Sequence, residues 1–207
     1  PPDFCHFLMD SMSNPLLDTS GLPRFDAIKP EHARPAIEEL IAAHRQKLAA
    51  ILDDADARDF STLVVPIEEM SHELSRVWSP VSHLQSVLED PAWRDAYNEW
   101  LPLMTEHSTE ISQNRRLYDA YRALADKLPA DADPSLRAIV DQELRDFRLA
   151  GVALPDDQKE RYREIMQSRA AAHARFYQNV QDATDAWQFD TTDESDLAGL
   201  PEKVVRR

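Results

Sequence analysis

The chain has 207 residues, 43% of them hydrophobic, which suffices for one large domain or two small ones with an ordinary core. Its 38 Asp and Glu outnumber 23 Lys and Arg, and the net charge of −15 argues against nucleic acid as a partner, since that affinity depends on basic side chains. Only three glycines occur, far apart, which excludes the clustered-glycine loops of dinucleotide folds and phosphate-binding loops.

The same scarcity of glycine, without runs of alternating β-branched residues between turns, predicts an all-α fold. The chain has one cysteine, Cys5, so it has no internal disulfide and suits a reducing compartment. The apolar run FCHFLM is too short to span a membrane, and no basic segment precedes it as in a signal peptide. We therefore expect a cytoplasmic protein with no membrane partner.

The first half of the chain predicts an extended segment followed by several helices. Residues 1–29 are rich in proline and are expected to be mostly extended. The first helix is predicted to start near Pro35, which suits a first helical position, and a second to run from about Phe60 to Trp78, with a kink or restart at Pro66. Ser79-Pro80 is predicted to end that helix, and a short one should follow at 81–88. The apolar stripe of the first helix is Ile37, Leu40, Ile41, His44, Leu48, Ile51 and Leu52.

In the second half of the chain the same two-residue signal for the start of a helix, Asp-Pro, occurs twice. Asp90-Pro91 and Asp133-Pro134 each combine a capping residue with a proline suited to the first turn. A short helix is expected between them around residues 117–124, and Gly151 is placed to close the later one. A last, long helix should run from about Asp156 to Trp187, with a possible strand beginning at 187–189. Its apolar positions are Tyr162, Ile165, Met166, His173, Phe176, Val180, Ala183 and Trp187, and those of the helix after Asp90 are Trp93, Tyr97, Leu101, Met104, Ser108 and Ile111.

The stretch MSHELSRVWSPVSHLQ, residues 70–85, contains half of a zinc-peptidase motif. In His-Glu-x-x-His two histidines four residues apart share one helix face and hold a metal, but here Arg76 occupies the second position. A local site made of His72, Glu73 and His83 is the alternative. On one continuous helix those histidines would lie about 16 Å apart along the axis, whereas zinc ligands lie about 2 Å from the metal. Only a sharp reversal at Pro80 could bring them together, so a structural role is preferred.

No residue is assigned a catalytic, cofactor-binding or metal-binding role from the sequence. The other internal histidines show no ligand spacing, and His44 and His173 fall on or beside apolar faces, as hydrogen-bonded core or boundary histidines do. Asp54-x-Asp56 lacks the glycine and closing Glu of a calcium loop. The carboxylates Asp141, Glu143 and Asp146, interleaved with Arg137, Arg145 and Arg148, are interpreted as ordinary exposed helix surface.

Several segments, taken in order, carry a family resemblance. They are NPLL (14–17), LPRF (22–25), IKPEHARPAIEE (28–39), RVWSPVSHLQSV (76–87), ELRDFRLAGVALP (143–155), RYREI (161–165), FYQNVQDATDAW (176–187) and DLAGLPE (196–202). In this order and spacing the chain, from Ser13 onward, resembles the N-terminal part of the oligopeptidase A branch of the thimet oligopeptidase family of zinc metallopeptidases. Similar proteins begin near Met12, so residues 1–12 are expected to be an upstream extension.

The resemblance implies a family of cytosolic metallopeptidases that cut short peptides in a channel between two mostly helical lobes. The family's zinc is held by His-Glu-x-x-His and a later Glu, and nothing here matches those positions. We therefore expect an array of antiparallel helices ending in one long helix, an incomplete part of such a peptidase. The expected divisions are an extended segment at 13–29, a helical N-terminal domain at 30–187, and the start of a truncated following region at 188–207.

On this interpretation the parent protein is a zinc-dependent metalloendopeptidase, and this chain alone binds no zinc and is inactive. Its partners would be short peptides and the remaining C-terminal, catalytic part of the same protein. The alternative hypothesis, from a different class, is a free-standing acidic helical module that holds a peptide or a partner helix in an apolar groove.

Overall fold

The computed structural model describes residues 14–54, 59–88 and 90–205, and these ranges contain helices and no strand, which confirms the all-α prediction. The chain divides into two compact units, Pro1–Ala171 and Ala172–Arg207. The predicted domain boundaries at 12, 29 and 187 stay predictions. The elements, in chain order, are α2 (Pro30–Asp53), the π-helical turn η1 (Phe60–Val64), α3 (Val65–Val87), α4 (Pro91–Ser112), α5 (Arg115–Lys127), α6 (Pro134–Leu149), α7 (Asp156–Asp185), the 3-10 turn η2 (Glu194–Leu197) and α8 (Glu202–Val205).

Helix α2 begins at Pro30, so the predicted start near Pro35 is wrong by more than one turn. Pro30 takes the first-turn position that proline favours, and the backbone N–H of Lys29 donates to Nδ1 of His32 at 3.1 Å. Pro35 lies inside the helix on its exposed side. Proline has no backbone N–H, so one hydrogen bond near the start of the helix is lost. Burial of the apolar side chains along the rest of α2 stabilises the helix by more than this loss.

Helix α3 runs without a break from Val65 to Val87, so the predicted end at Ser79-Pro80 and the separate short helix at 81–88 are wrong. Pro80 is itself buried, and Val77 and Val81 on either side of it are completely buried. A proline in a helix interior costs about 3 kcal/mol, and burial of several large side chains offsets that amount. Near Pro66, where a kink or a restart was predicted, the π-helical turn η1 passes into α3 at Val65 while the backbone stays helical.

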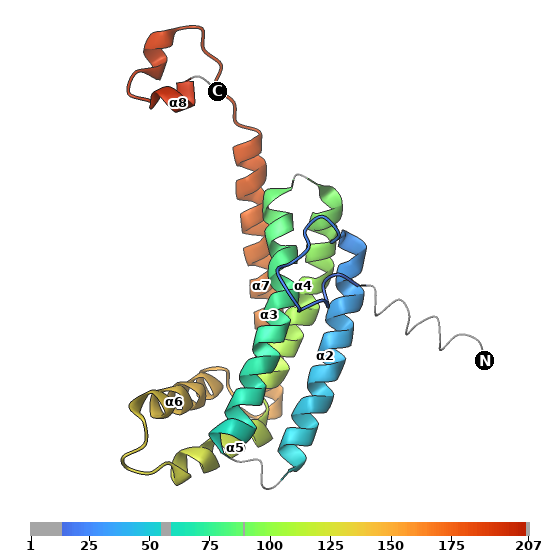
Figure 1. The fold of residues 1–207 in the computed structure, drawn as a ribbon, viewed down its shortest axis with the longest axis vertical. Helices are drawn as coiled ribbons and strands as arrows, with labels where there is room; N and C mark the ends of the chain where they lie inside the picture. Colours follow the sequence, from blue (N-terminus) through green and yellow to red (C-terminus); the bar gives the residue numbers. More distant parts are fainter. Residues whose placement is uncertain (1–13, 55–58, 89, 206–207) are drawn as a thin grey trace, which may run out of the picture. The chain divides into compact units, whose positions relative to one another are not determined.

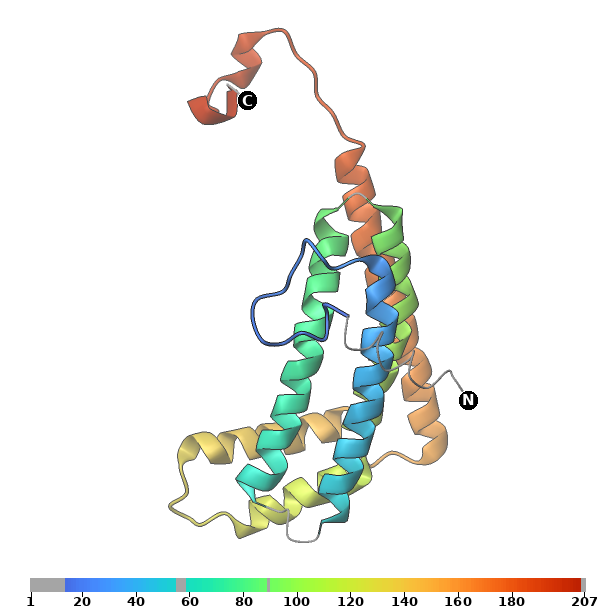
Figure 2. The ribbon, with the colours of Figure 1, turned by 45° about the vertical axis from the view of Figure 1, so that its right-hand side comes forward.

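Helices α2, α3 and α4 lie side by side, each antiparallel to the one before, and each packs against the other two (Figures 1 and 2). Their shared apolar core includes Ile37, Val77 and Trp100, and the segment before α2 adds Leu16 and Ile28 to it. This segment, residues 14–29, passes over the helices in Figure 2. On α4 the predicted apolar positions did not include Trp100 and His107, which are buried. They did include Ser108, which is exposed.

A second apolar core joins five elements: η1, the C-terminal part of α2, the N-terminal part of α3, α5 and α6. Tyr121 of α5 and Phe147 of α6 are buried there with ring centroids 5.6 Å apart. Helix α6 ends at Leu149, and Gly151 follows it as the predicted left-handed cap, with a φ of 79° that only glycine adopts without strain. The N–H of Gly151 donates to Arg148 and that of Val152 to Phe147, the double hydrogen bond of a Schellman cap.

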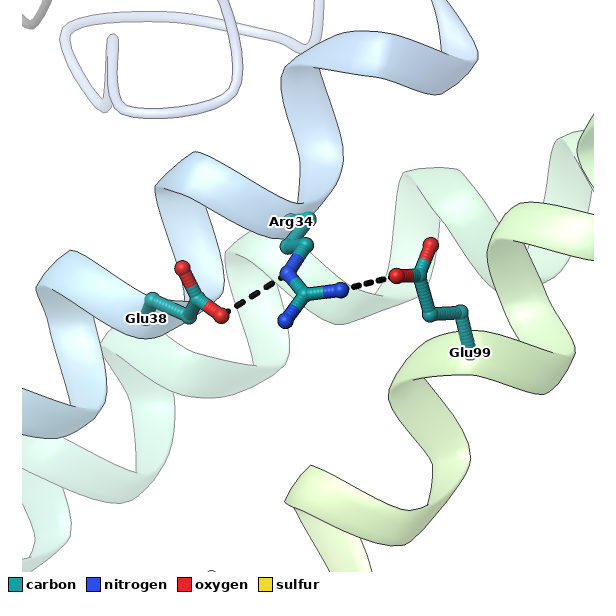
Figure 3. Close-up of polar contacts among 3 residues, drawn as sticks. All are labelled: Arg34, Glu38 and Glu99. Atoms are coloured by element: carbon teal, nitrogen blue, oxygen red, sulfur yellow. Dashed lines mark hydrogen bonds and ion pairs between the residues drawn. The ribbon is translucent and has the colours of Figure 1, made fainter.

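Ion pairs lie on the exposed surface of the three helices α2, α3 and α4. The guanidinium of Arg34 on α2 pairs with Glu38, one turn further along, and with Glu99 on α4 (Figure 3). All three side chains are about half exposed, at 51% to 52%. Exposed pairs of this kind contribute little to stability, so the array is held mainly by its apolar core.

Helix α7 ends at Asp185, two residues before its predicted end. Many of its predicted inward positions are exposed, including Ile165 at 49% and Phe176 at 64%. The predicted strand at 187–189 is wrong, because those residues have no regular secondary structure and η2 follows them. Within the described ranges no helix combines the length and the apolar character that crossing a membrane requires.

Candidate functional site

The half-motif at residues 70–85 lies on one uninterrupted helix. His72 and His83 are therefore separated by three turns of α3, and the reversal at Pro80 that a shared metal would need does not occur. His83 instead packs edge-on against Phe25, with ring centroids 5.8 Å apart. No group of three or more His, Cys, Asp or Glu side chains with metal-binding geometry occurs in the described ranges. The geometry gives the local metal hypothesis no support.

Glu73, the second residue of the half-motif, contacts one of two neighbouring buried histidines. Its Oε2 atom lies 3.2 Å from Nε2 of His44 on α2, and the rings of His44 and His107 are 5.8 Å apart. Burial lowers the pKa of both histidines, opposed at His44 by Glu73 and reinforced at His107 by His44. The prediction of a hydrogen-bonded core histidine is thus confirmed for His44. It is wrong for His173, which is exposed and packs against Tyr177.

A pocket in the first unit lies between α6 and the N-terminal part of α3, two helices that Figure 1 labels. It is a pocket of about 700 Å³, within the range of small-molecule and peptide side-chain sites. Its lining, called here the α3–α6 pocket, consists of Phe60, Val64, Val65, Glu68, Glu69, His72, Ala138, Ile139, Gln142 and Glu143. Apolar side chains and carboxylates share this lining.

The α3–α6 pocket is strongly acidic. Glu69 is paired with Lys47 at 3.6 Å, whereas Glu68 and Glu143 have no basic partner in the described parts of the chain. Burial raises the pKa of the half-buried Glu143, and the neighbouring carboxylates of Glu68 and Asp146 raise it further. Two carboxylates of like charge therefore face one opening without neutralisation, which favours a positively charged ligand.

A buried tyrosine adjoins the same charges. The hydroxyl of Tyr121 has no hydrogen-bond partner among the described residues, although its side chain is completely buried. Burial raises the pKa of Tyr121, and the charges of Glu143 and Glu68 add to the rise. Tyr121 is therefore a neutral donor beside the pocket. The lining itself offers carboxylates, one imidazole, one amide and apolar side chains, and it contains no Ser, Thr, Cys or Lys.

The carboxylates of this pocket were not predicted from the sequence. Glu143 was expected on an exposed helix surface, but it is half-buried. A signal was present, because Glu143 lies three residues after Val140 and four before Phe147, and both of those are buried on the inner side of α6. What the sequence could not give is the partner element, since the pocket exists only where α6 meets η1 and α3.

Comparison with known proteins places these elements in one family. Residues 37–159, from α2 to the start of α7, match the model of the neurolysin/thimet oligopeptidase N-terminal domain. Oligopeptidase A of Haemophilus influenzae is 41% identical over 197 residues, which are 95% of this chain and 29% of that protein. Oligopeptidase A of Escherichia coli is 38% identical over 94% of this chain and 29% of its own length.

A dipeptidyl carboxypeptidase of Salmonella typhimurium is also similar, with 32% identity over 93% of this chain and 29% of that protein. The chain thus spans less than a third of the length of the curated relatives it matches. The family match covers more than half of the chain, and it confirms the resemblance inferred from the ordered motifs. The chain belongs to the neurolysin/thimet oligopeptidase N-terminal domain family.

Proposed function

We propose that this chain forms the N-terminal, helical wall of the substrate channel in a zinc-dependent metalloendopeptidase that hydrolyses short peptides. The observation that carries the proposal is the match to oligopeptidase A of Haemophilus influenzae, which extends over 95% of the chain at 41% identity. The antiparallel helices α2, α3 and α4 would form the wall, since large buried side chains fill the core that they share and close packing limits their movement. The single cysteine agrees with a cytoplasmic location, which we include in the proposal.

The catalytic zinc is assigned to another part of the parent protein. A catalytic zinc site needs three protein ligands around one point, and the described residues offer no such set. No catalytic step is therefore ascribed to a side chain of this chain. Its own contribution is to bind and orient a peptide, which lowers the entropic cost of reaching the reactive geometry.

A chimera tests the proposal. In oligopeptidase A of Haemophilus influenzae the matching segment is replaced by this chain, and hydrolysis of a quenched fluorescent peptide is measured with and without a chelator. We expect chelator-sensitive cleavage by the chimera, bound zinc at about one equivalent, and neither property in the 207-residue chain alone. The control is the same protein with the segment deleted.

Two outcomes would contradict the proposal. Chelator-sensitive cleavage by the isolated chain would place the catalytic centre in it. A chimera that folds and holds zinc but does not cleave would show that this chain cannot replace the matching wall. If the isolated chain then unfolded cooperatively as a monomer and bound peptide, the free-standing binding module would be the better description.

A further inference from the structure

The α3–α6 pocket combines two features that together select a class of ligand. Val65 and Ile139 line it and are each 39% exposed, so apolar surface is available to a ligand. Glu68 and Glu143 add carboxylates that no basic side chain in the described ranges neutralises. A ligand that fits must carry a positive charge and also an apolar body.

Other occupants fit less well. An anion would meet Glu68, Glu69 and Glu143, so like charges would repel it. A metal ion needs several ligands within coordination distance of one point, and the carboxylates and His72 do not converge in that way. A neutral apolar ligand would cover Glu68 and the half-buried Glu143 without compensating their charges, which is unfavourable.

We propose that the α3–α6 pocket binds the side chain of an Arg or Lys residue of a peptide. The aliphatic stem of such a side chain can lie along Val65 and Ile139 while its charged end reaches Glu68 and Glu143. A volume of about 700 Å³ exceeds one side chain and leaves room for an apolar neighbour of the basic residue. A bound cation also removes the repulsion between the two carboxylates, and this favours binding over the empty pocket.

The choice of a peptide over another organic cation rests on the proposed function, but the pocket's charge selectivity does not. The chimera reports cleavage, whereas binding is measured on the 207-residue chain without any catalytic step. Failure of one experiment is therefore distinguishable from failure of the other.

The probe is a fluorescein-labelled peptide, Gly-Leu-Arg-Leu-Gly, titrated with the chain and followed by fluorescence anisotropy. Its partner probe carries citrulline in place of arginine, which keeps the shape and removes the charge. We expect the arginine peptide to bind at least about fivefold more tightly than the citrulline peptide, with the difference shrinking as salt is added. Agmatine, a guanidinium without a peptide backbone, should compete weakly.

Variants locate the site. Glu143→Gln should weaken binding of the arginine peptide by about fivefold and leave the citrulline peptide unchanged. Asp141→Asn, an exposed position on the same helix outside the lining, is the matched control and should change neither. Circular dichroism of each variant verifies that it is folded.

The proposal is overturned if the two peptides bind equally, if neither binds at about 1 mM chain, or if Glu143→Gln and Asp141→Asn have the same effect. Agmatine binding as tight as that of the arginine peptide would overturn the choice of a peptide. Loss of the arginine preference in the chimera would show that another part of the whole protein fills the pocket, and would overturn the proposal for that protein.

Discussion

Glu73 on α3 contacts His44 on α2, with 3.2 Å between the carboxylate Oε2 and the imidazole Nε2. The side chain of Glu73 is 45% exposed and that of His44 only 3%, so the pair bridges from the surface to the interior. Behind His44 lies His107, whose Nδ1 atom is buried without a hydrogen-bond partner among the described residues. Two imidazoles are thus enclosed between three helices, and Glu73 hydrogen-bonds to one of them.

This arrangement predicts a pH dependence of stability. Burial lowers the pKa of both histidines in the folded chain, opposed by Glu73 at one and by Glu110 at the other, while Lys47 and Arg45 add to the lowering. The unfolded chain therefore binds more protons below about pH 6.5, and the free energy of unfolding falls as the pH drops below that value. Urea unfolding at pH 7.5 and 5.5 measures the loss.

The matched variants for this prediction remove titratable groups. Replacing His44 and His107 together by Gln should flatten the pH dependence between pH 7.5 and 5.5, since glutamine does not titrate. His83→Gln is the control, because His83 is exposed. An equal slope for all three proteins would show that the buried histidines are not responsible.

Local signals predicted some of the fold, and packing decided the rest. Asp90 and Asp133 do cap α4 and α6, each accepting a hydrogen bond from a backbone N–H two residues later. Such caps are short-range, so the sequence contains all that is needed to recognise them. The interruption expected at Pro80 fails because Val77 and Val81 gain more from burial than proline costs, which depends on elements far away in the chain. The α3–α6 pocket was unpredictable for the same reason.

Glu143→Gln is expected to stabilise the folded chain at pH 7. Burial and the charges of Glu68 and Asp146 raise the pKa of Glu143, so its ionised form is unfavourable in the folded state and the penalty grows as the pH rises through that pKa. Glutamine keeps the shape without the charge. The free energy of unfolding should rise by about 0.5 kcal/mol at pH 7, and the gain should disappear at pH 4. A loss of stability would mean that the carboxylate has a favourable structural role, and would weaken the case for a ligand site.

Two neighbouring positions on α2 should differ sharply in their effect on stability. Ile37 is completely buried in the three-helix core, whereas Arg34, one turn earlier, is about half exposed in its ion pairs (Figure 3). Ile37→Ala should lower the free energy of unfolding by about 2 to 5 kcal/mol. Arg34→Ala should cost a small fraction of that, and added salt should remove the cost because exposed pairs are screened. Comparable losses in urea unfolding would contradict a fold held by its core.

Gly151→Ala should destabilise the turn that joins α6 to α7. The φ of 79° at Gly151 is a left-handed conformation that alanine adopts at a cost of about 1 to 2 kcal/mol. An added Cβ would also collide with Cδ1 of Leu154, which would have to move. We expect a lower melting temperature, by about 2 to 8 °C, in a thermal scan.

Gly21→Ala is the control for this turn, because a Cβ there meets no atom within 4 Å and its φ is not positive. That substitution should leave the melting temperature unchanged or raise it slightly, since alanine restricts the unfolded chain. Arg76 donates to the backbone carbonyl of Gly21, a contact that alanine preserves. If both substitutions lowered the melting temperature equally, the left-handed cap at Gly151 would not be what positions α7 after α6. If only Gly151→Ala did so, the cap that closes α6 would be a true constraint on the fold.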